Sequence, residues 1–248
     1  MRPDYVDFHA HLDLYPDLAR AIAACERQRV ATLAVTTTPK AFERNVELSA
    51  GSNFVRVGLG LHPQLVADRH LEIDLFEKLL PQTRYVGEIG LDRGPAHYRS
   101  FELQQSVLGK ILRACAELGD KILSLHSVRA TKPVLDMLDE YLPPDRGRAV
   151  LHWFTGTNSE VRRAVERGCF FSVNEAMLST ESGLRILREI PPSRILTETD
   201  GPFVKRGQNP IAPGDVSQVV RIISESMSVS VNQTRSRIVQ NLSALVSN

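Results

Sequence analysis

The chain has 248 residues, of which 42% are hydrophobic and 24% charged, and its formal net charge is +1 at pH 7. We expect one cytoplasmic domain over residues 1–248 with no membrane partner, because this composition excludes a disordered chain, no targeting segment precedes the first apolar run, and no run is long enough to span a bilayer. The small net charge argues against a protein that coats nucleic acid through its overall field, and the unpaired cysteines 25, 115 and 169 predict buried thiols, not a disulfide framework.

Strand-like apolar runs alternate with helical patterns along the whole chain. The runs cover residues 5–9, 30–36, 54–61, 84–90, 121–126, 148–153, 169–173 and 194–199. Apolar residues at three- and four-residue spacing predict helices at 17–29, 40–50, 69–80, 99–118, 130–141, 158–167, 179–190, 215–227 and 231–246. This alternation predicts parallel strands with crossover helices, and eight repeats favour an α/β fold of the (β/α)8 TIM-barrel type over an open, doubly wound sheet. The Pro- and Gly-rich segment 201–214 should arch over the rim of the barrel as a substrate loop.

Side chains of metal-ligand type stand where these apolar runs end. They are His9, His11, Glu88, His126, His152 and Asp200. The C-terminal ends of barrel strands open on one rim, so residues far apart in sequence can converge there. A lone buried histidine is more often hydrogen-bonded in a core than bound to metal, but burying six titratable side chains at one rim is costly without a cation. The set exceeds the needs of one tetrahedral ion and fits two divalent ions bridged by a carboxylate, for which Glu88 is the natural candidate.

The motifs DFHAHLD, GLHP, VGEIGLD, LHS, HWFTG and TETDGPF resemble, in this order, those of the TatD family of metal-dependent deoxyribonucleases in the amidohydrolase superfamily. The resemblance covers essentially the whole chain. It implies that His9 and His11 hold one ion with Asp200, that Glu88 bridges, and that His126 and His152 hold the second ion. It also matches His62 with a histidine that contacts phosphate in the family.

Several departures from the family pattern fall on the side expected to face substrate. Gln64 follows His62-Pro63 where the family commonly has histidine, and Val128 separates His126-Ser127 from Arg129, which directly follows the serine in the family. Arg93 stands in place of an aromatic residue. These variants look most like the TatD-type nucleases of the Qat anti-phage defence system, which implies an antiviral role and other Qat proteins as partners.

The predicted chemistry is the metal-dependent hydrolysis of DNA phosphodiester bonds, and the resemblance implies a 3′ to 5′ deoxyribonuclease acting on DNA ends, with single-stranded ends expected. Two divalent ions are expected, with Zn²⁺, Mn²⁺ and Mg²⁺ all compatible with a mixed N/O site. Asp200 and Glu88 are the predicted catalytic residues, with Asp200 accepting a proton from the attacking water. Candidate phosphate-binding residues, each of which could equally be a solvated surface charge, are Arg93, Arg129, Lys205 and Arg206. Trp153 and Phe203 could stack a base, although a tryptophan at such a position is more often core.

Two alternatives stay open at this point. The same centre suits an amidohydrolase-type enzyme acting on a small ester, amide or phosphoester, because the fold alone does not select the substrate. If the altered rim no longer admits DNA, the barrel could instead be a metal-stiffened scaffold subunit of a defence complex.

Overall fold

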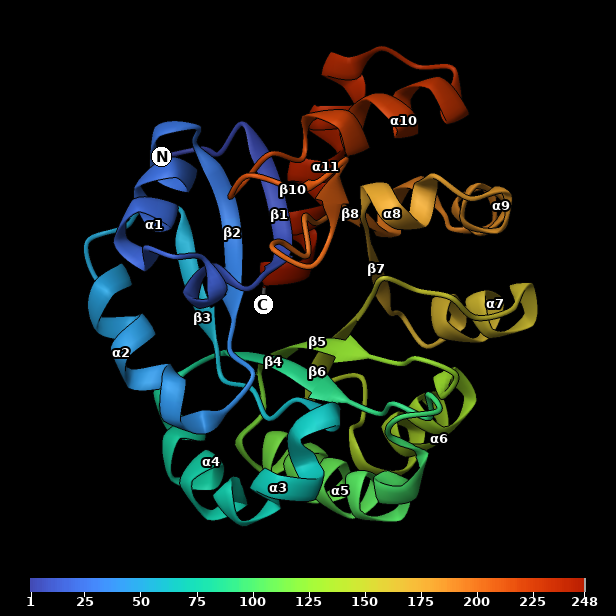
Figure 1. The fold of residues 1–248 in the computed structure, drawn as a ribbon. Coiled ribbons are helices and arrows are strands. Elements are labelled where there is room, and N and C mark those ends of the chain that lie inside the picture. Colours follow the sequence, from blue (N-terminus) through green and yellow to red (C-terminus); the bar gives the residue numbers. More distant parts are fainter. Residues whose placement is uncertain (248) are drawn as a thin grey trace.

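The computed structural model describes residues 1–247 and has parallel strands at its centre with helices outside them (Figure 1). The main strands are β1 Tyr5–Ala10, β2 Val30–Val35, β3 Val55–Gly58, β4 Tyr85–Gly90, β5 Lys121–His126, β6 Gly147–His152, β7 Phe170–Val173 and β8 Ile195–Thr197. Each predicted run overlaps one of these strands. The short strands β9 Lys205–Arg206 and β10 Asn209–Pro210 form an antiparallel hairpin within the predicted substrate loop.

Helices follow nearly every strand, as the crossover pattern predicts. They are α1 Leu18–Arg27, α2 Pro39–Ser49, α3 Val66–Arg69, α4 Ile73–Leu79, α5 Phe101–Leu118, α6 Thr131–Tyr141, α7 Asn158–Glu166, α8 Glu175–Leu178, α9 Glu181–Glu189, α10 Ser217–Met227 and α11 Val231–Val246. Short 3-10 turns are η1 Leu12–Leu14, η2 Pro63–Leu65, η3 His70–Glu72, η4 Leu80–Gln82, η5 Tyr98–Ser100 and η6 Pro192–Arg194.

Two helical details differ from the sequence prediction. The helix expected at 69–80 is divided into α3, η3 and α4. Leu71, in the connecting turn, is 78% exposed, so no buried apolar face holds a continuous helix there. The short helix α8 was not predicted, and it begins because the Asn174 side chain accepts a hydrogen bond from the Met177 N–H at 2.8 Å.

The strands form two parallel sheets, ordered β1-β2-β3 and β4-β5-β6-β7-β8, and hydrogen bonds join the sheets at both seams. At the seam between β3 and β4, the Leu59 N–H donates to the Tyr85 carbonyl at 3.0 Å. At the seam between β8 and β1, the Asp200 N–H donates to the His9 carbonyl at 2.9 Å. The eight strands therefore follow one another around a barrel of the predicted (β/α)8 type.

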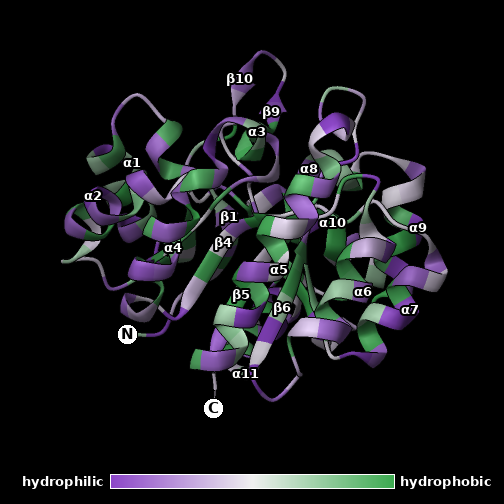
Figure 2. Cartoon of the chain, turned by 90° about the horizontal axis from the view of Figure 1, so that it is seen from below, coloured by the Kyte–Doolittle hydropathy of each residue, from purple (hydrophilic) through white to green (hydrophobic). Residues whose placement is uncertain are grey.

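The apolar core fills the barrel and the layer between strands and helices. Figure 2 shows green hydrophobic stretches in the middle of the chain's inner strands, such as β5, while purple hydrophilic residues alternate with green ones along the helices. Cys25, Cys115 and Cys169 are free and buried, as predicted. Burial raises the pKa of both the Cys25 and the Cys115 thiol to about 12, so neither is a nucleophile at neutral pH. Within residues 1–247, no helix has the length and apolar character that crossing a membrane requires.

Candidate metal centre

The predicted metal ligands lie together at the C-terminal rim of the barrel. His126 and His152 are the last residues of β5 and β6, and Glu88 lies near the end of β4. All members of the set are buried, with exposures of 0 to 7%: His9, His11, Glu88, His126, His152 and Asp200. The parallel arrangement of the strands therefore brings together side chains from both ends of the sequence.

Four of these side chains point their polar atoms at one position. The Nε2 atoms of His9 and His11 are 3.3 Å apart. They lie 3.4 and 3.2 Å from Glu88 Oε2, and 3.7 and 3.5 Å from Asp200 Oδ1. A tetrahedral ion with bonds of about 2.0–2.2 Å keeps its ligand atoms about 3.3–3.6 Å apart. These separations therefore fit a single divalent cation held by two nitrogen and two oxygen atoms.

The other oxygen of Glu88 faces a second group of imidazoles. Glu88 Oε1 lies 2.7 Å from His126 Nδ1, 3.1 Å from His152 Nε2 and 3.2 Å from His62 Nε2. The two oxygens of one carboxylate thus address two separate clusters of nitrogen atoms, which is the placement that a bridging carboxylate needs. His62, expected from the sequence to contact substrate, lies beside this second group.

The partners of the outward-facing ring nitrogens determine which nitrogen of each histidine carries a proton. His126 Nε2 lies 3.0 Å from Asp92 Oδ2, and His152 Nδ1 lies 3.3 Å from Glu198 Oε1. Asp92 and Glu198 only accept hydrogen bonds when ionised, so they keep a proton on the outward nitrogen of each ring. The inward nitrogen, which faces the Glu88 carboxylate, would release its proton when a cation binds and then present a lone pair, as a metal ligand must. His9 Nδ1 lies 2.7 Å from Ser124 Oγ, a hydroxyl that can accept in the same way.

In His62 the proton lies on the opposite side of the ring, on the nitrogen that faces the cluster. The backbone N–H of Gln64 donates to His62 Nδ1 at 3.1 Å, so that nitrogen is an acceptor. A neutral His62 ring consequently carries its proton on Nε2, the atom that faces Glu88. The ring therefore offers an N–H donor at the rim where the other histidines offer lone pairs, which suits contact with an anionic oxygen better than contact with a cation.

The electrostatics of the cluster favour bound positive charge. Burial acts to raise the pKa of Glu88, but His62, His152 and His9 outweigh burial and hold that pKa well below its ordinary value. Burial acts to lower the pKa of His11, but hydrogen bonds to Asp200 and Glu88 raise it to about 9. The carboxylates thus draw a proton onto His11, and a divalent cation meets the same demand for positive charge.

Glu198 and Asp92 are site residues that the sequence interpretation missed. Glu198 is fully buried, and its oxygens also accept hydrogen bonds from the Trp153 N–H at 3.1 Å, from Asn174 Nδ2 at 2.9 Å and from the Ser172 hydroxyl. With both oxygens occupied in this way, Glu198 positions His152. The signal was present in TETD and GLD, since a ligating histidine needs an acceptor for its outer nitrogen.

A cavity of about 470 Å³ lies over the cluster and is lined by several of the predicted substrate residues. Arg129, Trp153 and Phe203 all line it, and Phe203 is 58% exposed with its ring centroid 5.0 Å from that of His11. Arg129, Trp153 and Asp200 have φ angles of +52°, +37° and +46°. Non-glycine residues rarely adopt such angles, and they concentrate at functional sites.

The remaining candidate cations lie outside this lining. The Arg93 guanidinium stacks 5.3 Å from the Phe101 ring centroid. Arg206 donates to Glu175 Oε2 at 2.7 Å and to Asp215 Oδ2 at 3.0 Å, which ties the β9–β10 hairpin to neighbouring segments. Lys205 is exposed on β9. Of the predicted phosphate-binding arginines, the structure brings Arg129 alone to the cavity.

Sequence comparisons point to one family, and a comparison of structures shows the same fold. A sequence model described as TatD related DNase matches residues 6–247. The deoxyribonuclease Tat-D of Schizosaccharomyces pombe is 36% identical over 117 residues, which is 47% of this chain and 37% of that protein. The 3′-5′ ssDNA/RNA exonuclease TatD of Citrobacter rodentium is 33% identical over 128 residues, 50% of this chain and 48% of that one. The aligned segment thus spans less than half of either relative. The crystal structure of YJJV, a TatD homologue from Escherichia coli K12, superposes with a TM-score of 0.87 at 23% identity, covering 99% of this chain and 98% of that one.

Proposed function

This chain belongs to the family of TatD related DNases, and on that premise we propose that it is a divalent-metal-dependent hydrolase of DNA phosphodiester bonds. The observation that carries the proposal is the placement of Glu88, whose two oxygens face two groups of imidazole nitrogens under an open cavity. We assign His9, His11, Glu88 and Asp200 to one ion, and His126 and His152 with Glu88 to a second. Two bound ions would neutralise charge on the phosphoryl group and make the attacking water more acidic.

Asp200 is the proposed proton acceptor. Burial acts to raise its pKa, but a hydrogen bond from His11 and the nearby imidazoles lower it below its ordinary value. The carboxylate is therefore ionised at neutral pH and can take the proton of a water molecule aligned for attack. The same group can return that proton to the leaving oxygen, in a general acid–base role worth about 10²- to 10⁴-fold.

The rim residues are proposed to hold the substrate. The Nε2–H of His62 would donate to a phosphate oxygen, and Arg129 would neutralise the phosphate charge. Phe203 and Trp153 line the cavity and offer faces on which a base can stack, which an unpaired end permits more readily than a duplex. A single-stranded end is therefore the proposed substrate. The 3′ to 5′ polarity is supported by the name of the Citrobacter rodentium relative.

A defence role within a Qat system, with other Qat proteins as partners in the cytoplasm, is a finer proposal. It is supported by the departures at Gln64 and Val128-Arg129 from the common family motifs. Gln64 and Arg129 line the cavity, so these changes fall where substrate choice would be affected. Protection against phage by the intact operon, and its loss with Asp200→Asn, is the corresponding test.

The test of the enzymatic proposal uses metal-loaded protein with single-stranded and duplex oligonucleotides labelled at either end. Asp200→Asn should lower cleavage by about 10²- to 10⁴-fold, since it removes the proton acceptor while keeping side-chain volume. Asp68→Asn, an exposed change on α3, is the matched control and should leave cleavage unchanged. Hydrolysis of small esters or amides without cleavage of DNA would support the amidohydrolase alternative. Folded, metal-loaded protein that hydrolyses nothing would support the scaffold.

A further inference from the structure

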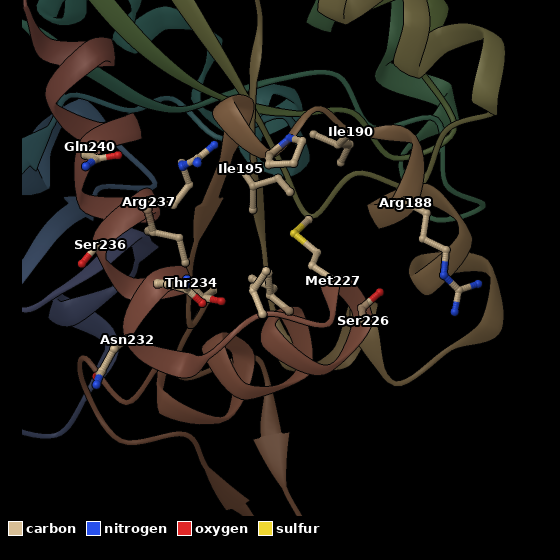
Figure 3. A pocket seen from close by; sticks show the side chains of 15 residues that line it. Arg188, Ile190, Ile195, Ser226, Met227, Asn232, Thr234, Ser236, Arg237 and Gln240 are labelled. Atoms are coloured by element: carbon tan, nitrogen blue, oxygen red, sulfur yellow. The ribbon is translucent and has the colours of Figure 1, made fainter.

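A second cavity, of about 810 Å³, is lined by residues between 188 and 240. It shares no lining residue with the cavity over the metal-ligand cluster, and it is larger than that cavity. Its wall includes Ile195, the first residue of β8, whereas Asp200 follows the other end of that strand. The ends of α9 and α10 and the start of α11 enclose it (Figure 3). We call it the α10–α11 recess, defined by Ile190, Ile195, Ile223, Met227 and Ile238.

The floor of the recess is apolar. Ile190, Ile195 and Ile223 are each 2% exposed, and Ile238 is 3% exposed. The Met227 side chain projects between the two sides in Figure 3, and its flexible thioether can adapt to an occupant. Val229, which also lines the recess, is 43% exposed. The isoleucines are already shielded from water, so an alkyl or aryl group placed here would cover mainly the exposed surface of Val229 and of the half-buried Met227. The volume lies within the range of about 300–1,000 Å³ that is usual for small-molecule sites.

Some polar side chains of the recess have no partner among residues 1–247, although Gln233 and Thr234 in its lining are hydrogen-bonded. Arg188 and Arg237 lie on opposite sides of it (Figure 3), and neither side chain has an ion pair or hydrogen bond with any residue in 1–247. The lining contains no aspartate or glutamate. Ser226 Oγ is buried and has no hydrogen-bond partner among the described residues. A buried hydroxyl without a partner is unfavourable, and a ligand with an acceptor group would satisfy it.

We propose that the α10–α11 recess binds a small amphipathic organic anion, with its apolar body on the isoleucine floor and its carboxylate, sulfate or phosphate head at an edge. The two arginines and the absence of carboxylates in the lining select negative charge. Met227 and Val229, beside the isoleucine floor, select an apolar body. The site is separate from the metal-ligand cluster, so its occupancy does not depend on the proposed nuclease activity.

The probe for this proposal is decanoate, titrated below its micelle concentration by isothermal calorimetry, with decyltrimethylammonium as the cation of equal chain length. Decanoate should bind with one site per chain, and the cation should not. Arg188→Gln or Arg237→Gln should weaken decanoate binding by roughly tenfold, and the affected arginine identifies the edge that holds the head. Arg185→Gln, one helical turn away on α9 and outside the lining, is the matched control and should bind normally.

A second pair of variants tests the apolar body. Met227→Glu places a carboxylate in the centre of the recess and should abolish binding, whereas Met227→Leu should retain it; circular dichroism and cleavage activity should match the parent in both. Phosphatidylglycerol vesicles should not sediment the protein, because the floor of the recess is set back from the surface. If the vesicles did sediment the protein, if Met227→Glu abolished that sedimentation, and if decanoate did not bind, the anion would belong to a membrane surface and the proposal would be overturned. The proposal would also be overturned by equal binding of decanoate and decyltrimethylammonium, or by decanoate binding that is unchanged in both arginine variants. A dimer of the parent protein that Met227→Glu dissociates would likewise overturn it, because a second copy of the chain would then cover the recess.

Discussion

Glu88→Gln tests whether one carboxylate serves two ions. The change keeps the shape of the side chain but removes its charge, and it leaves an amide that can accept through only one of its two terminal atoms. Two imidazoles face one oxygen of Glu88 and three face the other, so no orientation of the amide satisfies both groups. Removing one partner of a buried ionic contact costs about 3–5 kcal/mol. Since about 1.4 kcal/mol is tenfold in an equilibrium constant, the affinity for each ion should fall by roughly a hundredfold to a few thousandfold.

The measurement is metal content by mass spectrometry after dialysis at fixed free metal, followed by titration for each dissociation constant. Glu175→Gln is the matched control, because Glu175 pairs with Arg206 outside the cluster. Thermal unfolding of the metal-free proteins should first establish that both variants are folded. Retention of two full equivalents by Glu88→Gln would refute the bridging assignment. Loss of one equivalent with the other intact would place Glu88 on a single ion.

Three further predictions follow from the same geometry. His62→Gln should keep both metal equivalents while cleavage falls by roughly tenfold to a hundredfold, the effect of losing a hydrogen bond of about 1.5–3 kcal/mol to a charged group; loss of metal would make His62 a ligand. Protonation of His11, whose pKa is raised to about 9, competes with the cation, so metal affinity measured by titration should rise as the pH increases from 7 to 9 and then level off; a flat profile would contradict this competition. A thiol reagent at pH 8 should leave Cys25 and Cys115 unmodified in the native protein, because their pKa values of about 12 keep them protonated, and should modify every cysteine after unfolding; rapid native labelling would show that these thiols are accessible.

The barrel and the position of the ligand cluster could be predicted because both depend on patterns that sequence carries directly. A buried parallel strand is a continuous apolar run, and a polar residue at its end must face the rim. This is why His126 and His152 could be placed together although the sequence shows no local motif between them. The start of α8 depended on one capping side chain, Asn174, which did not stand out within the apolar pattern.

The orientation of rings and rim cations could not be predicted in the same way. Which nitrogen of a histidine faces inward depends on the partner packed behind the ring, and that partner comes from a different strand. Arg129 and Arg206 look equally suited to phosphate in the sequence. The backbone of Arg129 is left-handed and its side chain reaches the cavity, whereas carboxylates from two other segments pair with Arg206. Whether an arginine at the rim can bind phosphate therefore depends on whether carboxylates from distant segments already pair with it.

Gln64 shows how the substrate rim can change while the ligand cluster is kept. Its backbone N–H sets the proton of His62 on Nε2, and any residue except proline at this position could make that contact. Its side-chain amide donates to Asp92 Oδ2 at 2.8 Å, the same oxygen that holds His126. The amide is neutral at every pH, so it supports Asp92 without adding a titrating charge beside the cluster, which a histidine here would do. A glutamine in this place therefore alters the surface offered to substrate while both neighbouring histidines retain the proton positions that their proposed roles require.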